Sequence, residues 1–365
     1  MDCAENRGLS IPSSRPVRVS VVVPCRNEIR YIREFLGTVL RQELGHLDME
    51  VLIVDGMSDD GTRETLREFQ ERFAFIRMMD NPEQIVSTAM NRAIREAKGE
   101  IIVRMDAHTL YAPDYVRSCV EVLSETGAAN VGGPALTRAD GYVAEAIAHA
   151  FHTRFATGGA KYRDPQYEGP TDTVPYGCWR KSSLESIGLF DESLARGEDD
   201  DLNRRLAAAG GSVWQSPRIT SWYRPRFRLS RLCWQHFQYG FWKVPIVLRH
   251  GAHPTARNFV PALCLLAGTI LLLCAATVGA SGLAASRNPF LIAWLALVSV
   301  YLGTSFVAAL SVATRNGWRF LPVLPIVFAA FQFPYALGFL LGLVFPDSAS
   351  QHPNSIRRAV STITR

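Results

Sequence analysis

Cysteine is scarce in this sequence and never grouped. The 365 residues include seven cysteines, and no two of them form a C-x-x-C pair. Disulfide frameworks and zinc sites both need cysteines at short, regular intervals, so this spacing argues against either. The scattered thiols instead fit a reducing compartment.

The N-terminal segment lacks the apolar core of a secretion signal. Residues Met1 to Arg18 are polar or charged at too many positions for such a signal. We therefore expect the first domain to stay in the cytoplasm. Internal repeats and low-complexity segments are missing as well.

Charge is absent from three long runs in the C-terminal third: Phe259–Gly282, Phe290–Ala313 and Phe320–Phe345. A helix needs ~20 apolar residues to cross the ~30 Å hydrocarbon core of a bilayer. One such run could be a buried helix of a soluble protein, but three in succession predict membrane insertion. We expect a multi-pass inner (plasma) membrane protein, with a transmembrane region at 259–345 and a tail at 346–365.

The third run leaves its path open. It contains Pro322, Pro325 and Pro334, so it can be kinked, re-entrant or interfacial. Three full crossings would also place the tail, with its arginines, outside the cell. Basic residues usually prefer the cytoplasmic side, so this topology goes against the usual pattern.

Basic residues gather just before the first apolar run, within a net charge of +5. Such a cluster favours the cytoplasmic side and attracts anionic lipid headgroups, which explains it better than nucleic-acid binding. We interpret 231–257 as an amphipathic interfacial segment. The cluster comprises Arg224, Arg226, Arg228, Arg231, Lys243, Arg249 and Arg257.

The first 130 residues alternate short β-branched runs with helical patterns. This alternation predicts an α/β domain with a mainly parallel central sheet covered by helices. Ligands bind beyond the carboxyl ends of the strands in such sheets, which points to 24–28, 55–62 and 106–109. Strands are predicted at 18–23, 50–54, 75–79 and 101–105, and helices at 29–40, 62–72 and 83–98.

Two of these strand ends are followed by polar loops. The first strand runs into Pro24-Cys25-Arg26-Asn27-Glu28, which is also typical of an ordinary strand-to-helix turn. The second ends at Asp55, in V-D-G-M-S-D-D-G-T. Its carboxylate can accept hydrogen bonds from a base or ribose, while Asp59, Asp60 and Thr62 can cap the next helix. Both interpretations can hold together.

The fourth strand ends in Asp106-Ala107-His108. Side chains at i and i+2 point the same way from an extended segment, so Asp106 and His108 can share a ligand. A divalent ion bound to a diphosphate suits this pair, because the ion neutralises oxygens of the leaving group.

A run of acids, Glu198-Asp199-Asp200-Asp201, opens a predicted helix. The helix dipole stabilises acids at this end, which is one explanation for them. The other is catalytic. A carboxylate beside an attacking hydroxyl is the expected general base of a transfer reaction.

Together, P-C-R-N-E, D-G-x-S-D-D-G-T, D-A-H and E-D-x-D-L occur in an order that resembles the family 2 glycosyltransferases, over about Val17 to Lys243. Their fold is the GT-A type nucleotide-diphospho-sugar transferase fold, expected here at 15–230. The segment 173–180 is similar to one found before the acidic helix in this family. The chain most resembles bacterial exopolysaccharide enzymes of the succinoglycan glucosyltransferase type, which also carry an apolar C-terminal tail.

The resemblance assigns roles position by position. His108 stands where many members have a second aspartate, so the resemblance makes it a metal ligand for Mg²⁺ or Mn²⁺. Asp199 would be the base, with Glu198 supporting it. The residues implied around the nucleotide, usually uridine, are Pro24, Arg26, Glu28, Asp55 and Asp106, of which Asp106 contacts ribose or metal.

Acceptor contacts are less defined. Gln238-Tyr239-Gly240-Phe241-Trp242 is similar to the Q-x-x-R-W motif of processive members, except that phenylalanine replaces arginine. Gln238 and Trp242 line an acceptor channel in one interpretation and belong to an amphipathic helix on the membrane in the other. Trp179, like Trp222, offers a face for sugar stacking or fills the core. The arginines at 224, 226 and 228 hold either a lipid-linked diphosphate or lipid headgroups.

The resemblance therefore implies a membrane-anchored, metal-dependent, inverting transfer from a UDP-sugar to a polyprenyl-diphosphate-linked glycan, with the catalytic domain in the cytoplasm. Two other functions remain open: a processive polysaccharide synthase, and a catalytically silent membrane subunit that binds nucleotide-sugar.

Overall fold

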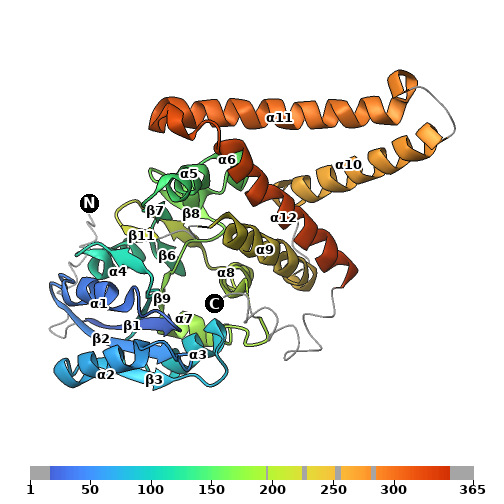
Figure 1. Cartoon of the computed structure of the whole chain (residues 1–365). Helices are drawn as coiled ribbons and strands as arrows, with labels where there is room; N and C mark the ends of the chain where they lie inside the picture. Colours follow the sequence, from blue (N-terminus) through green and yellow to red (C-terminus); the bar gives the residue numbers. More distant parts are fainter. Residues whose placement is uncertain (1–16, 195, 224–227, 251–255, 281–284, 346–365) are drawn as a thin grey trace, which may run out of the picture.

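The computed structural model describes residues 17–345 except 195, 224–227, 251–255 and 281–284. These residues form an α/β domain followed by four long helices (Figure 1). The predicted tail at 346–365, and Arg224 and Arg226 of the basic cluster, lie outside the described residues.

An eight-stranded sheet forms the centre of the domain, in the order β3-β2-β1-β4-β9-β6-β10-β8. Its first four strands are parallel to one another, which confirms the predicted parallel sheet, whereas β9 joins β4 and β6 as an antiparallel strand. The strands are β1 (Val17–Cys25), β2 (Leu47–Asp55), β3 (Ile76–Asp80), β4 (Ile101–Arg104), β6 (Asn130–Gly132), β8 (Gly169–Thr171), β9 (Cys178–Arg180) and β10 (Val213–Gln215).

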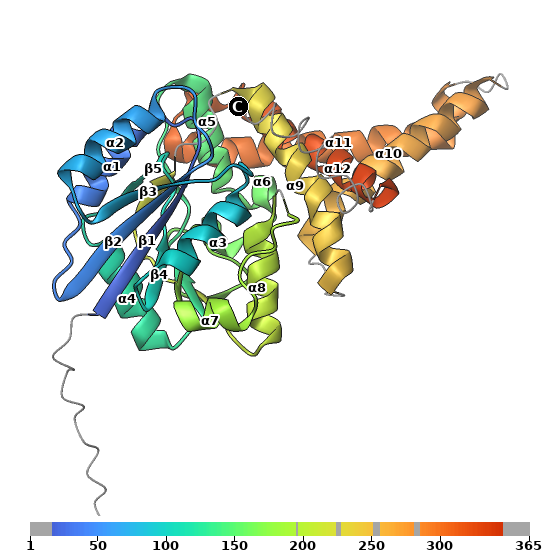
Figure 2. The same cartoon turned by 90° about the horizontal axis from the view of Figure 1, so that it is seen from below.

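Alternating residues of β1 enter two hydrophobic cores, one on each face of the sheet, as the two-residue repeat of a strand requires. Val21 packs with α1, α2 and α4, whereas Val22 packs with α3, α7 and α8. Figure 2 shows α1 and α2 on one side of these strands and α3 on the other. The covering helices are α1 (Ile32–Leu40), α2 (Thr62–Arg72), α3 (Val86–Glu96), α4 (Tyr115–Thr126), α7 (Lys181–Ser186) and α8 (Glu198–Ala208).

A second, three-stranded sheet in the order β5-β11-β7 continues from the strand end at Asp106. Its strands are β5 (Thr109–Tyr111), β7 (Leu136–Thr137) and β11 (Ser221–Tyr223). The short helices α5 (Tyr142–Phe151), α6 (Arg154–Thr157) and η1 (Lys161–Arg163) follow β7 in the chain. α5 and α6 both pack against the C-terminal helix α12.

The C-terminal part consists of α9 (Leu229–His250), α10 (Ala256–Ala280), η2 (Ala285–Arg287), α11 (Pro289–Asn316), η3 (Trp318–Phe320) and α12 (Leu324–Val344). Three of these helices, α10, α11 and α12, have the length and apolar composition to span a membrane, as predicted. The most apolar windows of α10 and α11 are only 11% and 6% buried, and both helices project from the domain (Figure 1). That exposed apolar surface needs an apolar environment.

α12 differs from α10 and α11, because 44% of its window is buried by protein. It lies against α9 at a distance that only glycine allows. A Cβ atom on Gly338 of α12 would stand 2.1 Å from the carbonyl oxygen of Phe237, and one on Gly240 of α9 would stand 2.0 Å from that of Tyr335. The predicted interfacial segment 231–257 therefore contains a helix that is packed against α12 along one face.

Candidate active site

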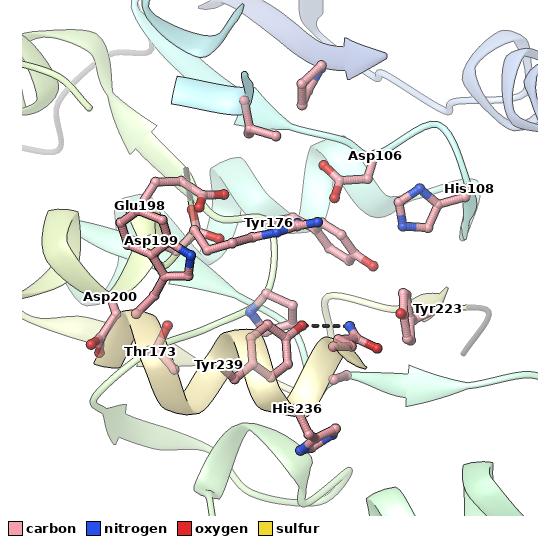
Figure 3. A pocket seen from close by; sticks show the side chains of 18 of the residues that line it. Asp106, His108, Thr173, Tyr176, Glu198, Asp199, Asp200, Tyr223, His236 and Tyr239 are labelled. Atoms are coloured by element: carbon pink, nitrogen blue, oxygen red, sulfur yellow. Dashed lines mark hydrogen bonds between the residues drawn. The ribbon is translucent and has the colours of Figure 1, made fainter. Parts of the chain in front are cut away.

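A cavity of about 2170 Å³ opens beyond the carboxyl ends of β1, β2 and β4 (Figure 3). All three loops predicted from the strand ends contribute to its wall, and so does the start of α8. The α9 and α12 helices close the opposite side. One cavity thus joins the predicted nucleotide loops, the acidic helix and the apolar helices.

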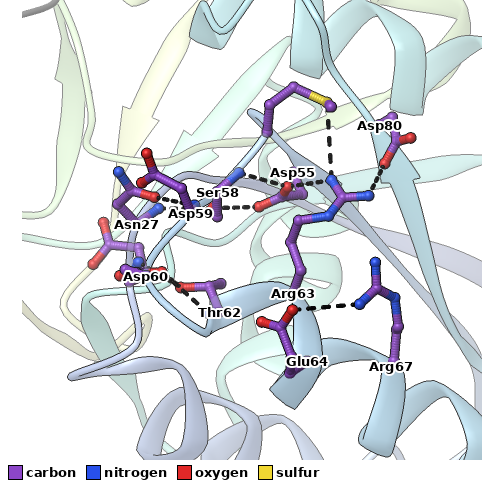
Figure 4. Close-up of polar contacts among 12 residues, drawn as sticks. Asn27, Asp55, Ser58, Asp59, Asp60, Thr62, Arg63, Glu64, Arg67 and Asp80 are labelled. Atoms are coloured by element: carbon purple, nitrogen blue, oxygen red, sulfur yellow. Dashed lines mark hydrogen bonds and ion pairs between the residues drawn. The ribbon is translucent and has the colours of Figure 1, made fainter.

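The first two loops are tied to each other by backbone and side-chain contacts (Figure 4). The Asn27 amide donates to Ser58 Oγ at 2.8 Å, and the Glu28 amide donates to Thr62 Oγ1 at 2.9 Å. Asn27 has a φ of 55°, a left-handed conformation that asparagine tolerates better than most residues. Pro24, Arg26 and Glu28 of the first loop line the cavity, and their contact with a nucleotide stays a prediction.

Asp55 lies behind this wall and is fully buried. Its carboxylate accepts from the Ser58 amide at 3.0 Å and from Arg63 Nη1 at 2.7 Å, and Arg63 also reaches Asp80 at 2.7 Å. Asp60 accepts from the Thr62 amide at 3.0 Å, but the N-cap of α2 is Gly61, so none of the three predicted residues caps this helix with its side chain. Asp55 therefore shapes the loop through Ser58 and Arg63, and its direct contact with a nucleotide stays a prediction.

Arg104 connects the end of β4 to the acidic helix α8, although no motif in the sequence indicated it. The side chain is 7% exposed. Its Nε lies 3.0 Å from Asp106 Oδ1, and its Nη1 lies 2.7 Å from Asp199 Oδ1 and 3.5 Å from Glu198 Oε1. An arginine inside the buried run Ile101–Met105 was the available signal, because a buried charge requires partners.

Asp199 points into the cavity with 34% of its side chain exposed. Burial by the surrounding protein raises the pKa of its carboxyl, the Arg104 guanidinium lowers it, and Glu198 and Asp106 raise it again, so that it reaches about 7. A carboxylate with a pKa near neutrality suits general-base chemistry.

The neighbouring Asp200 has a different environment. Burial would raise its pKa, but Lys243 Nζ at 3.0 Å and Arg204 Nε at 3.4 Å lower it on balance. Asp200 therefore stays ionised and links α8 to α9 through Lys243. Both aspartates line the cavity, and Asp200 in addition joins two helices through Lys243.

Asp106 and His108, the predicted metal ligands, both line the cavity. His108 Nδ1 lies 3.2 Å from Glu28 Oε1, so the loop after β4 contacts the loop after β1. The part of the chain that the structure describes contains no cluster of three or more metal-ligating side chains. A pair is compatible with Mg²⁺, which usually binds one or two protein carboxylates together with substrate phosphates and water.

The predicted acceptor residues do not gather at one place. Trp242 lines the cavity and packs against Leu194 and Ile246. Gln238 is buried outside the cavity wall. Trp179 is 1% exposed and meets Phe190 edge-on in the core under α3 and α8. Sugar stacking by Trp179 is therefore wrong, because core side chains cover its ring.

Of the basic cluster, Arg228, Arg231 and Lys243 line the cavity. They lie on its α9 side, at the junction of the α/β domain and the apolar helices. The side chains of Arg249 and Arg257 lie outside what the structure describes.

Comparison with known proteins agrees with this geometry. The family model "Glycosyl transferase family 2" matches residues 20–188. The chain is 35% identical over 243 residues to the succinoglycan biosynthesis protein ExoA of Rhizobium meliloti (strain 1021), covering 66% of this chain and 73% of that protein.

A second relative comes from Methanococcus voltae. It is named as a dolichyl N-acetyl-α-D-glucosaminyl phosphate 3-β-D-2,3-diacetamido-2,3-dideoxy-β-D-glucuronosyltransferase and is 28% identical over 230 residues, covering 61% of this chain and 71% of that protein. Among solved structures, the mannosyltransferase PcManGT of Pyrobaculum calidifontis, in complex with GDP-Man and Mn²⁺, superposes with a TM-score of 0.54 at 20% identity, covering 90% of this chain and 88% of that one. This likeness supports the GT-A type fold. The chain belongs to glycosyltransferase family 2.

Proposed function

We propose that this chain is a membrane-anchored, inverting glycosyltransferase that moves a sugar from a UDP-sugar to a lipid-linked glycan in exopolysaccharide or cell-surface glycan synthesis. The observation that carries the proposal is the position of Asp199. Its carboxylate, with a pKa of about 7, faces the same cavity as the nucleotide loops and the Asp106–His108 strand end. A base and a diphosphate site in one cavity are what transfer to a hydroxyl requires.

The relatives support the choice of substrate class. One is named for succinoglycan biosynthesis, and another for transfer to a sugar on dolichyl phosphate. The described structure fits such an acceptor, because the cavity extends from the nucleotide loops to Phe331 and Tyr335 of the apolar helix α12. A lipid-linked glycan would reach this wall from the membrane, with the α/β domain on the cytoplasmic face.

Asp106 and His108 would hold Mg²⁺ or Mn²⁺. Such an ion, when bound, would supply positive charge against the charge that develops on the departing diphosphate. Glu28 orients the His108 ring through its 3.2 Å contact with Nδ1. Arg104 holds Asp106 and Asp199 in fixed relation, so the leaving-group side and the attacking side keep their spacing.

Asp199 then takes the proton from an acceptor hydroxyl while the hydroxyl oxygen bonds to the anomeric carbon. The bond from that carbon to the diphosphate oxygen breaks, and the electron pair leaves with the nucleoside diphosphate. Attack from the face opposite the leaving group inverts the anomeric configuration. Glu198, 3.5 Å from Arg104 Nη1, shares that guanidinium, and its negative charge helps to raise the pKa of Asp199.

The test is transfer from radiolabelled UDP- and GDP-sugars in membranes that contain the protein, with native lipid extract as acceptor. We expect one donor to label one lipid-linked product, EDTA to abolish the labelling, and Asp199→Asn to lose transfer while keeping UDP binding. UDP binding without turnover from any donor would instead assign the chain as a silent subunit. A ladder of long products would indicate a processive synthase.

A further inference from the structure

The path of α12 relative to the membrane follows from what its two ends contact. A helix of 21 residues is ~31 Å long, about the thickness of the hydrocarbon core. If α12 spanned the bilayer, one of its ends would therefore lie that far from the α/β domain. Both ends instead contact elements that are fixed to this domain.

The start of α12 is held by α5. Leu324 is fully buried in a hydrophobic core that also contains Ile147 of α5. Directly before α12, η3 is fastened to the same helix. The Tyr142 hydroxyl donates to the carbonyl oxygen of Arg319 at 2.6 Å, and the Arg319 side chain pairs with Glu145. α12 therefore begins on the surface of the α/β domain.

The last turns of α12 are held by α9. A Cβ atom on Gly342 would stand 2.8 Å from the carbonyl oxygen of Phe241 and 3.1 Å from Cγ2 of Val244. Beside these two residues, Lys243 pairs with Asp200 of the acidic helix α8 at 3.0 Å. Because this ion pair joins α9 to α8, the far end of α12 also lies at the α/β domain.

The middle of α12 forms part of the cavity wall, through Phe331, Gln332 and Tyr335. Gln332 Nε2 donates to the carbonyl oxygen of Phe155 in α6. The opposite wall carries charged side chains such as that of Asp199, and charged groups are costly inside hydrocarbon. The middle of α12 therefore lies at the depth of the aqueous cavity, outside the hydrocarbon core.

α12 leaves one narrow apolar stripe exposed. Four of its five exposed large side chains are separated by seven, four and seven positions, a spacing that returns to the same face of a helix. These four are Ile326, Phe333, Leu337 and Val344, and the fifth is Leu343. In α11, by contrast, no residue from 289 to 304 is buried. α12 thus offers one line of contact to its surroundings, whereas α11 offers its whole circumference.

We propose that α12 lies along the membrane surface with this stripe in the lipid, and that only α10 and α11 cross the bilayer, as a hairpin. The stripe rests at the boundary of headgroups and acyl chains, where a helix with one apolar face binds. Figure 1 shows α10 and α11 projecting from the domain while α12 lies beside α9. Two crossings return the chain to the side on which it started. This inference rests on the membrane attachment in the proposed function and specifies its topology.

The charges at the two ends of the hairpin favour the same topology. Arg315 and Arg319 follow the end of α11 that meets the α/β domain, and Lys243 of α9 lies at this domain too. The stretch 275–295 around the far turn contains Arg287 as its only charged residue. Because basic residues prefer the cytoplasmic side, the α/β domain and the end of α12 are both cytoplasmic.

Reporter proteins fused after Arg365 of the full chain test the number of crossings in bacterial cells. A green fluorescent protein matures in the cytoplasm, whereas alkaline phosphatase needs the oxidising compartment outside it for its disulfides. We expect the first fusion to fluoresce and the second to be inactive. The opposite pattern, an active phosphatase and a dark fluorescent protein, indicates three crossings and would overturn the proposal.

The turn of the hairpin is tested with a membrane-impermeant maleimide. Ser286→Cys, in the exposed η2, should be labelled in intact spheroplasts above the background of the wild type. Ser182→Cys, exposed on α7, is the matched control and should be labelled only after lysis. Labelling of Ser286→Cys only after lysis would show that the hairpin does not cross, which refutes the proposal. Neither result depends on sugar transfer, so failure of the proposed chemistry stays distinguishable.

A lysine in the stripe tests what covers it. Leu337 and Leu302 are exposed near the middle of α12 and of α11. A lysine at the membrane surface reaches the headgroups, whereas one in the middle of a crossing helix disfavours insertion. We expect Leu302→Lys to reduce the protein recovered in carbonate-washed membranes, and Leu337→Lys to leave it unchanged. An equal loss in Leu337→Lys would place α12 in hydrocarbon. A wild-type dimer in mild detergent that becomes a monomer in Leu337→Lys would assign the stripe to a second copy, and either result overturns the proposal.

Discussion

Arg104 and Asp199 are 95 positions apart in the sequence, and Arg104 Nη1 lies 2.7 Å from Asp199 Oδ1. The same guanidinium reaches Asp106 through Nε at 3.0 Å. One buried cation therefore sets the distance between the end of β4 and the start of α8. The proposed base, Asp199, and the proposed metal ligand, Asp106, are thus both held by the Arg104 guanidinium.

Replacing Arg104 should reduce transfer strongly. Arg104→Met leaves Asp106, Glu198 and Asp199 close together without their cation, and we expect kcat to fall by at least ~100-fold. Arg104→Lys keeps the charge but cannot span two carboxylates as a planar guanidinium does, so a ~10-fold or larger loss is expected. Steady-state assays with the labelling donor measure both. Arg92→Lys, at an exposed pair with Glu83, is the control and should retain wild-type rates. Full activity of Arg104→Met would refute the supporting role.

Transfer should depend on pH through Asp199. Its pKa is raised from 3.8 to about 7, so the carboxylate is mostly protonated below that pH and mostly ionised above it. Because a general base works in its ionised form, kcat should rise ~10-fold per pH unit below 7 and level off above. Asp200→Asn should keep this inflection, since the pKa of Asp200 is lowered. A flat profile between pH 5 and 8 would argue against Asp199 as the base.

The Lys243–Asp200 ion pair should position the acidic helix. The two side chains are about one-fifth exposed, and such a pair contributes at most about 1 kcal/mol. We expect Lys243→Met to lower kcat by ~3- to 5-fold with unchanged UDP binding, and Lys243→Arg to restore most of the rate. A loss of UDP binding equal to the loss in kcat would show that the pair maintains the fold in general.

The close contact of α9 with α12 should be sensitive to a single methyl group. Gly338→Ala would place a Cβ atom 2.1 Å from the Phe237 carbonyl oxygen, so the helices must move apart. Overpacking of this kind costs about 1–3 kcal/mol, which corresponds to a Tm lower by ~2–10 °C in detergent. Gly303→Ala on α11 is the control, because its Cβ would meet nothing within 4 Å among the described residues. Equal melting of the two variants would contradict this packing.

The loops at the site were predictable because each follows a strand with a clear local pattern. Asn27 and Ser58 belong to loops 31 residues apart, yet both follow parallel strands that are neighbours in the sheet, so their contact follows from the topology. Helix starts were less exact. The helix predicted from Ile29 begins at Ile32, since Glu28 to Tyr31 form the turn that meets the second loop.

Burial was poorly predicted at the residues proposed for the acceptor, because motif likeness and aromatic type do not indicate burial. Trp179 is a core residue of β9, whereas Tyr223 and His236, which line the cavity, belong to no motif used in the prediction. His236 and Tyr239 are ordinary members of a helix when considered alone. Only the packing of α9 against α12 and α5 brings them to one cavity.

The sequence by itself determined the parallel strands that precede the nucleotide loops, the acidic helix and the three apolar helices. Those features depend on local periodicity, turn residues and the length of uncharged runs, which are all properties of short segments of sequence. The tertiary structure decided the partners of Arg104, the burial of Trp179 and the residues of α9 and α12 that line the cavity. These depend on which distant surfaces come into contact, and here glycines on α9 and α12 allow an approach that no local pattern specifies.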